Sequence, residues 1–475
     1  MTAAADPTRP APVPTRAPVL WGFRLIPRIE TYPKVVSFAQ TDVGKIALLG
    51  IFAIGLWYSH PVWQVLIVLL AVITLLPRYR RMVLTLGTLF WAFGILWQST
   101  DPPLLLPVAM VLILAALLFW AAIRFRHSWV GRRPVACLLM GFALSVLAAS
   151  YLPKGGHLHT ASWAFLTAAG AYLWFIAYSI LDAGSKSRDP FVLQVGTYRP
   201  FWGGSNTPFV KGAAYLRRIE AHNPEQLAVA QLKGLKLLAW SVILDLFLRK
   251  AFVPMVYGHL GVPEFSQLFQ FSVQRGSFPW YVGWASLIAH FLEDLLRLSI
   301  SGHRIVASCR MAGFLALRNT CRPLQSRSIA EFWNRYFYYF KELLVDCFFY
   351  PTFMRYFKRH PRWRLFAATF AAACFGNAFY HFFRDLRYIE DSGFWIALAG
   401  FQAYIFYTVV LAVGIGISQL RQRRAEATGW IPGRMAPAFC VAGFFCILSV
   451  FDWTDKRYPI QECFRFLAHL FNLTF

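Results

Sequence analysis

Long apolar runs alternate with short basic loops along most of this sequence. A helix that crosses a bilayer needs about 20 mostly apolar residues, and eleven runs approach that length. They lie at 44–59, 61–77, 82–98, 103–123, 134–152, 161–182, 235–256, 279–300, 364–383, 393–418 and 435–451. The pattern predicts an all-α polytopic integral membrane protein of about eleven transmembrane helices, the first two joined by a tight hairpin at Ser59-His60-Pro61.

The two ends of the chain differ from this pattern. Residues 1–40 are rich in Pro, Ala and Arg and lack the apolar core of a signal peptide. We expect them to form a cytoplasmic, largely disordered tail. Residues 41–455 then make up the transmembrane domain, and residues 456–475 an amphipathic C-terminal segment.

Two internal segments are too polar to cross a membrane simply. Residues 186–234 carry many charges, and Asn223-Pro224 is a helix start signal. Residues 303–363 are basic and aromatic, and too apolar for a free loop. Irregular backbone at membrane depth is tolerated only inside protein or along a cavity, so re-entrant or interfacial helices are expected there.

Composition supports a membrane location. The 475 residues are 57% hydrophobic and carry a net charge of +25, and the mean hydropathy is +0.47. This hydrophobicity excludes a soluble nucleic-acid-binding role. The basic clusters at 78–81, 124–133, 185–188 and 421–424 fall on one side of an eleven-span chain, which predicts a cytoplasmic N-terminus, an external C-terminus and contact with anionic membrane lipids.

Metal and disulfide chemistry is not expected. The eight cysteines are scattered, and no pair has zinc-ligand spacing. In the predicted span 279–300, His290, Glu293, Asp294 and Arg297 share one helical face, so we expect them either to pair with one another or to line a polar cavity.

One histidine stands out inside an apolar run. His381 lies in FGNAFYHFF, and an ionisable group at membrane depth is a functional candidate. It follows the aromatic and basic segment EFWNRYFYYFKELLVDCFFYP, residues 331–351. That segment and the residues before it contain an ordered series: Gly313-Phe314, Asn319, Pro323, Ser326, Ser328-Ile329, Glu331-Phe332-Trp333, Arg335, Asp346 and Pro351.

This series resembles the membrane-bound O-acyltransferase (MBOAT) family, in the bacterial branch of alginate O-acetylation and teichoic-acid D-alanylation membrane proteins. The resemblance implies an MBOAT-like fold in a bacterial cytoplasmic membrane. It also implies transfer of an acyl group from a cytoplasmic thioester, acyl-CoA or an acyl carrier protein, to a hydroxyl of an extracytoplasmic glycan or lipid. His381 would be the general base, with no bound cofactor or metal.

The resemblance and the residue types suggest supporting roles. Arg335, Arg322 and Lys341 are candidates to bind the donor's phosphates, or to reach lipid headgroups. Asn377, one turn before His381, either orients the imidazole or bonds a neighbouring helix, and Asp346 is expected to cap a helix or pair with an arginine. Trp333 and Glu331 complete the motif.

The chain also departs from the family pattern. Phe337 occupies a position where the family has a polar residue, and His381 is flanked by Phe379-Tyr380 and Phe382-Phe383. Two alternatives therefore stay open: a non-catalytic MBOAT-like scaffold that works with partner proteins, and a polytopic transporter.

Overall fold

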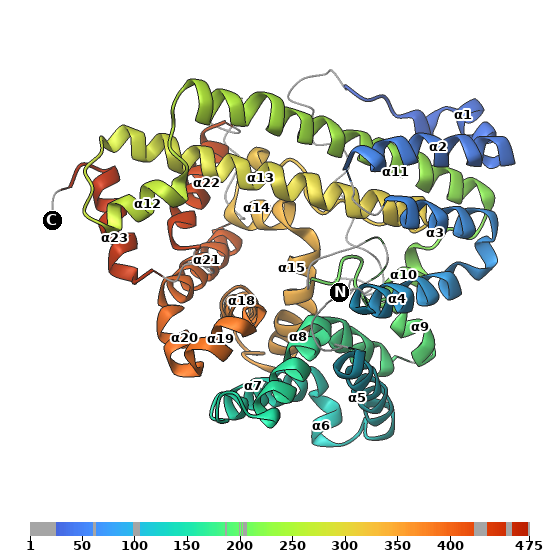
Figure 1. Cartoon of the computed structure of the whole chain (residues 1–475), viewed down its shortest axis with the longest axis horizontal. Helices are drawn as coiled ribbons and strands as arrows, with labels where there is room; N and C mark the ends of the chain where they lie inside the picture. Colours follow the sequence, from blue (N-terminus) through green and yellow to red (C-terminus); the bar gives the residue numbers. More distant parts are fainter. Residues whose placement is uncertain are drawn as a thin grey trace.

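The chain folds into a helical bundle whose elements are labelled in Figure 1. This computed structural model describes residues 25–59, 63–97, 105–185, 188–198, 200, 202, 207–421, 435–452 and 458–473. Every regular element within these ranges is a helix, so the predicted all-α class is confirmed. The predicted tail up to residue 24 and the His60-Pro61 part of the hairpin lie outside them.

The structure contains the helices of a membrane-embedded protein. Within the described residues, five helices are long and apolar enough to cross a membrane: Leu106–Arg124, His157–Ala183, Pro224–His259, Pro361–Arg384 and Gln402–Arg421. A sixth candidate combines α1 (Pro33–Gln40) and α2 (Asp42–Ser59), which meet at a bend of 96°. Apolar helices of 10–17 residues lie at Gln64–Leu75, Pro134–Ala149 and Ala436–Phe451. The total of eleven spans stays a prediction.

The first half of the chain supplies the blue and green helices of Figure 1. They are α3 (Trp63–Leu75), α4 (Arg80–Trp97), α5 (Leu105–Arg124), α6 (Trp129–Arg132), α7 (Pro134–Ala149), α8 (His157–Ala183), α9 (Phe191–Val195), α10 (Ala213–Ile219) and α11 (Pro224–Phe247), which continues through the π-helical segments η3 (Leu248–Phe252) and η4 (Pro254–His259). Asn223 caps α11 by accepting a hydrogen bond from the Gln226 backbone N–H, as its position before Pro224 predicts.

The second half supplies the yellow to red helices. They are α12 (Phe265–Val273), α13 (Trp280–Met311), η5 (Pro323–Gln325), α14 (Ile329–Tyr336), α15 (Tyr338–Leu344), η6 (Val345–Phe349), α16 (Tyr350–Arg355), α17 (Pro361–Phe370), η7 (Ala371–Gly376), α18 (Asn377–Arg384), α19 (Leu386–Ser392), α20 (Phe394–Gly400), α21 (Gln402–Arg421), α22 (Ala436–Leu448) and α23 (Ile460–Leu470).

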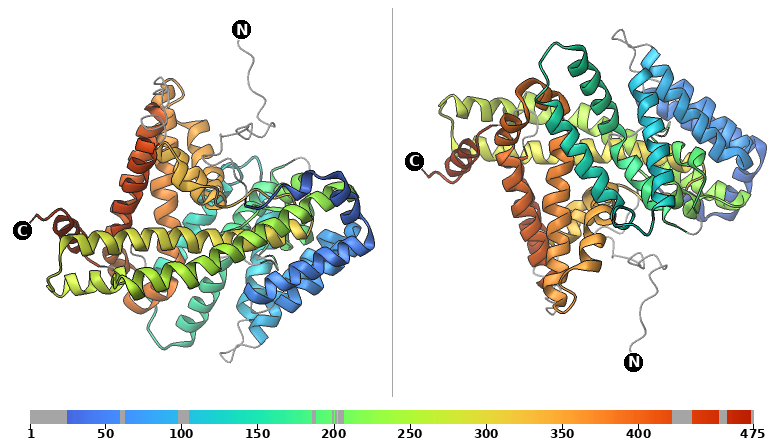
Figure 2. Two further views of the ribbon diagram at one scale, coloured as in Figure 1. Left: turned by 90° about the horizontal axis from the view of Figure 1, so that it is seen from above. Right: turned by 90° about the horizontal axis from the view of Figure 1, so that it is seen from below.

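Two predicted spans are parts of much longer helices. The run 235–256 belongs to a helix that extends over 36 residues, from Pro224 to His259. The run 279–300 belongs to α13, which has 32 residues and includes the first part of the segment predicted to begin a new element at 303. At 1.5 Å per residue each helix is longer than the roughly 30 Å hydrocarbon core. The two helices lie side by side and antiparallel (Figure 2).

A third predicted span is broken. The run 393–418 contains two helices, α20 and α21, that meet at the buried Phe401. Hydropathy does not reveal this break because apolar residues occupy both sides of it.

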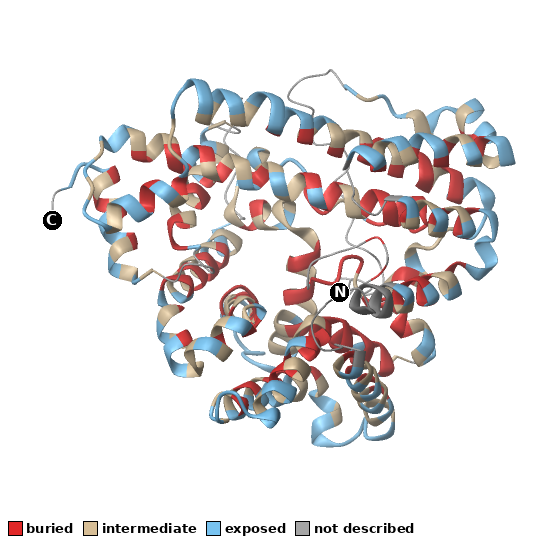
Figure 3. Ribbon diagram, viewed as in Figure 1, coloured by how far each residue is buried: buried red, intermediate tan, exposed pale blue. Residues whose placement is uncertain are grey.

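The motif helix α15 lies between two apolar cores (Figure 3). Its Phe340 is buried in the larger core, which includes α7, α8, α18, α21 and α23. The preceding residue, Tyr339, is buried in the second core, formed by α1 to α4, α11 and the C-terminal half of α13. The sequence segment that carries the family resemblance therefore joins the two halves of the molecule.

Candidate functional site

The motif segment folds back on itself before α15. The Asn319 carbonyl accepts a hydrogen bond from the Tyr338 N–H at 2.9 Å, and the Cys321 N–H donates to the Arg335 carbonyl at 2.8 Å. The Asn319 side chain is buried, and its Oδ1 accepts from the Tyr339 N–H at 3.3 Å. Asn319 thus fixes the first turn of α15, where backbone N–H groups lack partners within the helix.

Ser328 and Glu331 start the preceding helix, α14. The Ser328 hydroxyl accepts from the Glu331 N–H at 3.1 Å, and the Glu331 carboxylate accepts from the Arg327 N–H at 2.7 Å. This arrangement is close to a capping box. Glu331 also pairs with Arg335, one turn later, at 2.6 Å. These contacts give Glu331 a structural position at the helix start.

His381 lies against the motif helix. Its ring centroid is 5.6 Å from that of Phe340 in α15 and 4.7 Å from that of Tyr404 in α21. The Trp333 ring also packs against Phe340, with the ring centroids 6.1 Å apart. The structure therefore brings together the two sequence features, the 331–351 segment and His381, that the sequence analysis singled out.

Two polar atoms on this turn of α18 have no hydrogen-bond partner among the described residues. They are Nδ1 of His381 and Nδ2 of Asn377, both inaccessible to solvent. The other amide atom of Asn377, Oδ1, accepts a hydrogen bond from the Tyr404 hydroxyl at 3.2 Å. Buried polar groups are nearly always paired, so these two atoms, one helical turn apart, are available to bind a further polar group.

Among the described residues, no hydrogen bond joins the Asn377 side chain to the imidazole of His381. It bonds a neighbouring helix through Tyr404, which was one of the two roles left open for it. Tyr404 also lies against the His381 ring, so it links the two residues.

Two π-helical turns, η6 and η7, contain Asp346 and adjoin Asn377, respectively. Asp346 lies in η6, and η7 ends at Gly376, immediately before Asn377. The two segments pack against each other, and a Cβ added at Gly376 would lie 2.6 Å from the Phe348 ring. Such turns recur at functional sites because they shift side chains out of the regular helical register.

Sequence reasoning missed Lys211. Its Nζ lies 2.7 Å from Oδ2 of Asp346 and 2.9 Å from Oε2 of Glu342. Asp346 also accepts a hydrogen bond from the Tyr178 hydroxyl of α8, at 3.0 Å. The expected partner of Asp346 was an arginine. The cation is a lysine from the 207–211 loop, because that loop passes against α15.

The 207–211 loop is strained. Val210 and Lys211 have φ angles of +69° and +57°, a region that β-branched residues rarely occupy. Val210 is fully buried. Thr207, at the start of the loop, lies 2.7 Å from the Tyr380 hydroxyl, next to His381. No local sequence signal marks Lys211, since its partners lie more than a hundred residues away, although strain of this kind concentrates at functional sites.

Burial and the neighbouring charges shift the pKa values of Glu342, Asp346 and Lys211. Burial favours the neutral form of Glu342, but the neighbouring Lys341 and Lys211 outweigh it and lower the pKa of Glu342. Burial raises the pKa of Asp346, and Lys211 offsets only part of that effect. For Lys211, burial favours the neutral amine, but the attraction of Asp346 and Glu342 is stronger and raises the pKa of Lys211.

The three basic residues proposed for the donor's phosphates are in two places. Arg322 is exposed, and the Cys321–Arg335 hydrogen bond brings it near the backbone of Arg335. Lys341 instead pairs with Glu342 in the buried cluster and lies over the Tyr338 ring, 4.7 Å from its centroid. Arg322 and Arg335 remain candidates for one anion site, and Lys341 belongs to the internal cluster.

The polar face of α13 forms local ion pairs. Nε2 of His290 lies 3.4 Å from Asp294, and Arg297 pairs with Glu293. Tyr257 donates a hydrogen bond to Glu293 at 2.6 Å. Mutual pairing was one of the two expectations for this face. In the described residues, no three metal-binding side chains gather into a group that could hold an ion.

No family model matches the chain, and no curated protein sequence matches it.

Proposed function

We propose that the protein is a membrane-bound O-acyltransferase of the bacterial cytoplasmic membrane, with His381 as its general base. The observation that carries this proposal is the unpaired Nδ1 of His381, which lies beside the motif helix α15 and its Phe340. A neutral imidazole nitrogen without a hydrogen-bond partner can accept a proton from an incoming hydroxyl, because the hydroxyl need not displace another group.

The reaction requires one proton to move. As the acceptor hydroxyl attacks the carbonyl carbon of the thioester donor, an imidazole nitrogen of His381 takes its proton. The carbon–oxygen bond of the new ester forms, the carbon–sulfur bond breaks, and the proton passes to the departing thiolate. General base catalysis of this kind contributes about 10²–10⁴ in rate.

The surrounding residues would hold the imidazole in place. Phe340 and Tyr404 enclose the ring, and Tyr404 ties α21 to α18 through Asn377. The Asn377 Nδ2 group has two N–H donors and no hydrogen-bond partner among the described residues, so it is suited to bind an oxygen atom of a substrate. A donor thioester would approach from the cytoplasmic side and a glycan or lipid hydroxyl from the opposite side.

The test compares O-acyl groups on surface glycans and lipids in four strains. They are wild type, a deletion, His381→Ala and His157→Ala, in which a surface histidine at the start of α8 is the matched control. We expect the deletion and His381→Ala to lose the same acyl group, while His157→Ala retains it. Membrane levels of each variant are measured in parallel.

A non-catalytic scaffold is the second candidate, because Phe337 occupies a position where the family has a polar residue. It predicts loss of acylation on deletion and normal acylation in His381→Ala, the result that would overturn the proposed catalytic role.

A further inference from the structure

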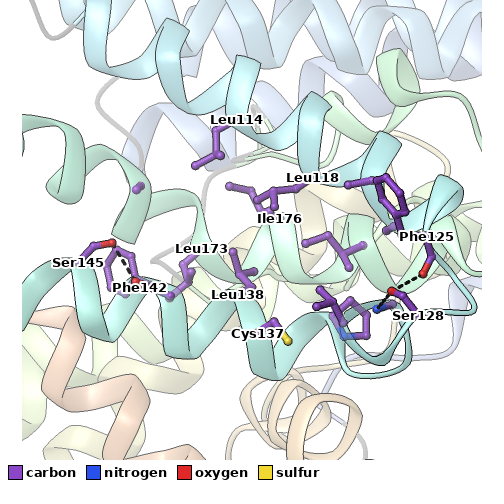
Figure 4. Close-up of a pocket in the computed structure, with 18 of the residues that line it drawn as sticks. Leu114, Leu118, Phe125, Ser128, Cys137, Leu138, Phe142, Ser145, Leu173 and Ile176 are labelled. Carbon is purple, nitrogen blue, oxygen red and sulfur yellow. Dashed lines mark hydrogen bonds between the residues drawn. The ribbon is translucent and has the colours of Figure 1, made fainter.

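A groove lies on the far side of α8 from the motif helix. Its volume is about 580 Å³, and it runs between α5, α7 and α8 down to the α6 turn (Figure 4). Its lining includes Leu114 and Leu118 of α5, Leu138 and Phe142 of α7, and Leu173 and Ile176 of α8.

The groove offers almost nothing to a polar ligand. Its two hydroxyl groups are already used: Ser128 donates to the Phe125 carbonyl at 2.7 Å, and Ser145 to the Gly141 carbonyl at 2.8 Å. The rest of the lining is aliphatic or aromatic apart from the Cys137 thiol. An apolar occupant is therefore favoured over water.

The surface around the groove is apolar and exposed. Helix α5 presents Ile113, Leu117 and Trp120 to the outside, each more than half exposed, and α7 likewise presents Met140 and Leu144. Large exposed apolar surfaces of this kind mark membrane contact. The groove is thus open to the lipid phase along helices that are apolar on both faces.

One end of the groove is strongly basic. The loop and turn that close it carry Arg124, Arg126, Arg132 and Arg133, all exposed. None of the four forms an ion pair with a carboxylate among the described residues. Arg124 and Arg133 stack over Phe125 and Trp129, which holds them at this end, and Phe125 itself lines the groove.

We propose that this groove binds an anionic phospholipid of the leaflet on the 124–133 side. One acyl chain occupies the apolar groove, and the phosphate and its headgroup lie against the arginine cluster. Arginine binds phosphate oxygens with paired N–H donors, and juxtamembrane basic clusters attract anionic lipids. The apolar lining holds the acyl chain, and the four arginines select the negatively charged headgroup.

This site is separate from the His381 region but adjoins it through α8. Leu173 lines the groove, while the next residue, Trp174, lies on Tyr380 and Phe348 with ring centroids 5.8 and 6.3 Å apart. A bound lipid therefore touches the helix that supports the cluster around Asp346.

Native mass spectrometry of the full chain tests the proposal, with phosphatidylglycerol and phosphatidylcholine as probes at equal concentration. Gly141 lines the groove, and a Cβ added there meets no atom within 4 Å, so Gly141→Leu places a side chain in the groove. The matched control is Gly443→Leu in α22, where a Cβ also meets nothing. Arg132→Gln/Arg133→Gln removes rim charge, and Lys34→Gln/Arg78→Gln removes two exposed charges elsewhere.

For the wild type and both controls, we expect the fraction of protein with one bound phosphatidylglycerol to be at least fivefold larger than the fraction with one bound phosphatidylcholine. Gly141→Leu loses that bound lipid, and the double arginine variant loses the preference. Retention in Gly141→Leu equal to wild type, or equal binding of the two lipids by the wild type, overturns the proposal. An equal loss in Gly443→Leu also overturns it. Thermal unfolding midpoints of Gly141→Leu and Gly443→Leu show that both variants are folded.

Discussion

The Nζ atom of Lys211 lies 2.7 Å from Oδ2 of Asp346, and it is held there by a loop with two successive residues of positive φ. Neither side chain is more than a fifth exposed. Removing one member of a buried ion pair leaves an uncompensated charge, at a cost of about 3–5 kcal/mol. We therefore expect Lys211→Met to lower the thermal unfolding midpoint of the purified protein clearly.

The double variant Lys211→Met/Asp346→Asn separates this charge effect from simple packing. Because it removes both charges, it should recover more than half of the stability lost in Lys211→Met. Additive losses would contradict the pairing. Lys34→Met, at an exposed position, is the control for loss of a lysine.

The pKa of Glu342 gives the protein an acid-sensitive element. Its pKa in the folded state lies below the ordinary value of 4.5. The carboxylate therefore contributes stability above pH 4.5 that is lost as the pH falls through the folded pKa. The pH dependence of the stability contributed by Asp346 has the opposite sign. Because the pKa of Asp346 is raised in the folded state, ionisation of this carboxyl destabilises the fold as the pH rises above 3.8.

Thermal unfolding between pH 3 and pH 7 measures this effect. We expect the thermal unfolding midpoint of the wild type to decrease as the pH is lowered below 4.5. The midpoint of Glu342→Gln should decrease less over the same pH range. Parallel curves for the two proteins would contradict the assignment. Asp42→Asn serves as a control because Asp42 is exposed and forms an ion pair with Lys45, three residues later on its own helix.

Gly376 allows η6 and η7 to approach closely. A methyl group at this position would lie 2.6 Å from the Phe348 ring, which cannot move freely in a packed interior. Overpacking of this kind costs about 1–3 kcal/mol. Gly376→Ala should lower the unfolding midpoint and also the acylation activity, since the next residue is Asn377.

Gly443→Ala is the matched control for that variant. It places the same methyl group in an apolar helix where nothing lies within 4 Å. Because alanine favours helix more than glycine, this control should be unchanged or slightly more stable. Equal behaviour of the two alanine variants would contradict the close approach.

The start of α14 tests whether Glu331 is structural. Ser328→Ala removes a helix cap and should cost about 0.5–2 kcal/mol. Glu331→Gln keeps an oxygen that can accept from the Arg327 N–H, whereas Glu331→Ala does not. Unfolding midpoints should therefore rank Glu331→Gln above Glu331→Ala. An equal decrease of the unfolding midpoint in both variants would mean that Glu331 stabilises the protein through its ion pair with Arg335 and not through the hydrogen bond from Arg327.

Sequence reasoning identified the parts of this site that depend on local chemistry. The apolar surroundings of His381 are visible in its neighbours. The capping roles of Ser328 and Glu331 were not predicted, although both residues were part of the motif series. The sequence analysis singled out His381 and the 331–351 segment together, but it did not predict the contact between His381 and Phe340. The break at Phe401 and the length of α13 were not predicted, because hydropathy averages over turns and over charges that face the interior.

Lys211 could not be found in this way. Its importance comes from Asp346 and Glu342, and no periodicity links residues so far apart. The positive φ angles of Val210 and Lys211 are also imposed by tertiary packing, since neither residue type favours them. Contacts of this kind become visible only when the fold is known.

The 207–211 loop has a consequence for biosynthesis. Lys211 leaves the ribosome well before Asp346, and Thr207 well before its partner Tyr380. At 5–20 residues per second, Asp346 is synthesised roughly 7–27 s after Lys211, and Tyr380 roughly 9–35 s after Thr207. During the first of these intervals the lysine lacks the carboxylates that hold it in the bundle. The nascent chain must therefore insert its early helices first, and the loop can take its strained conformation only when α15 and α18 have arrived.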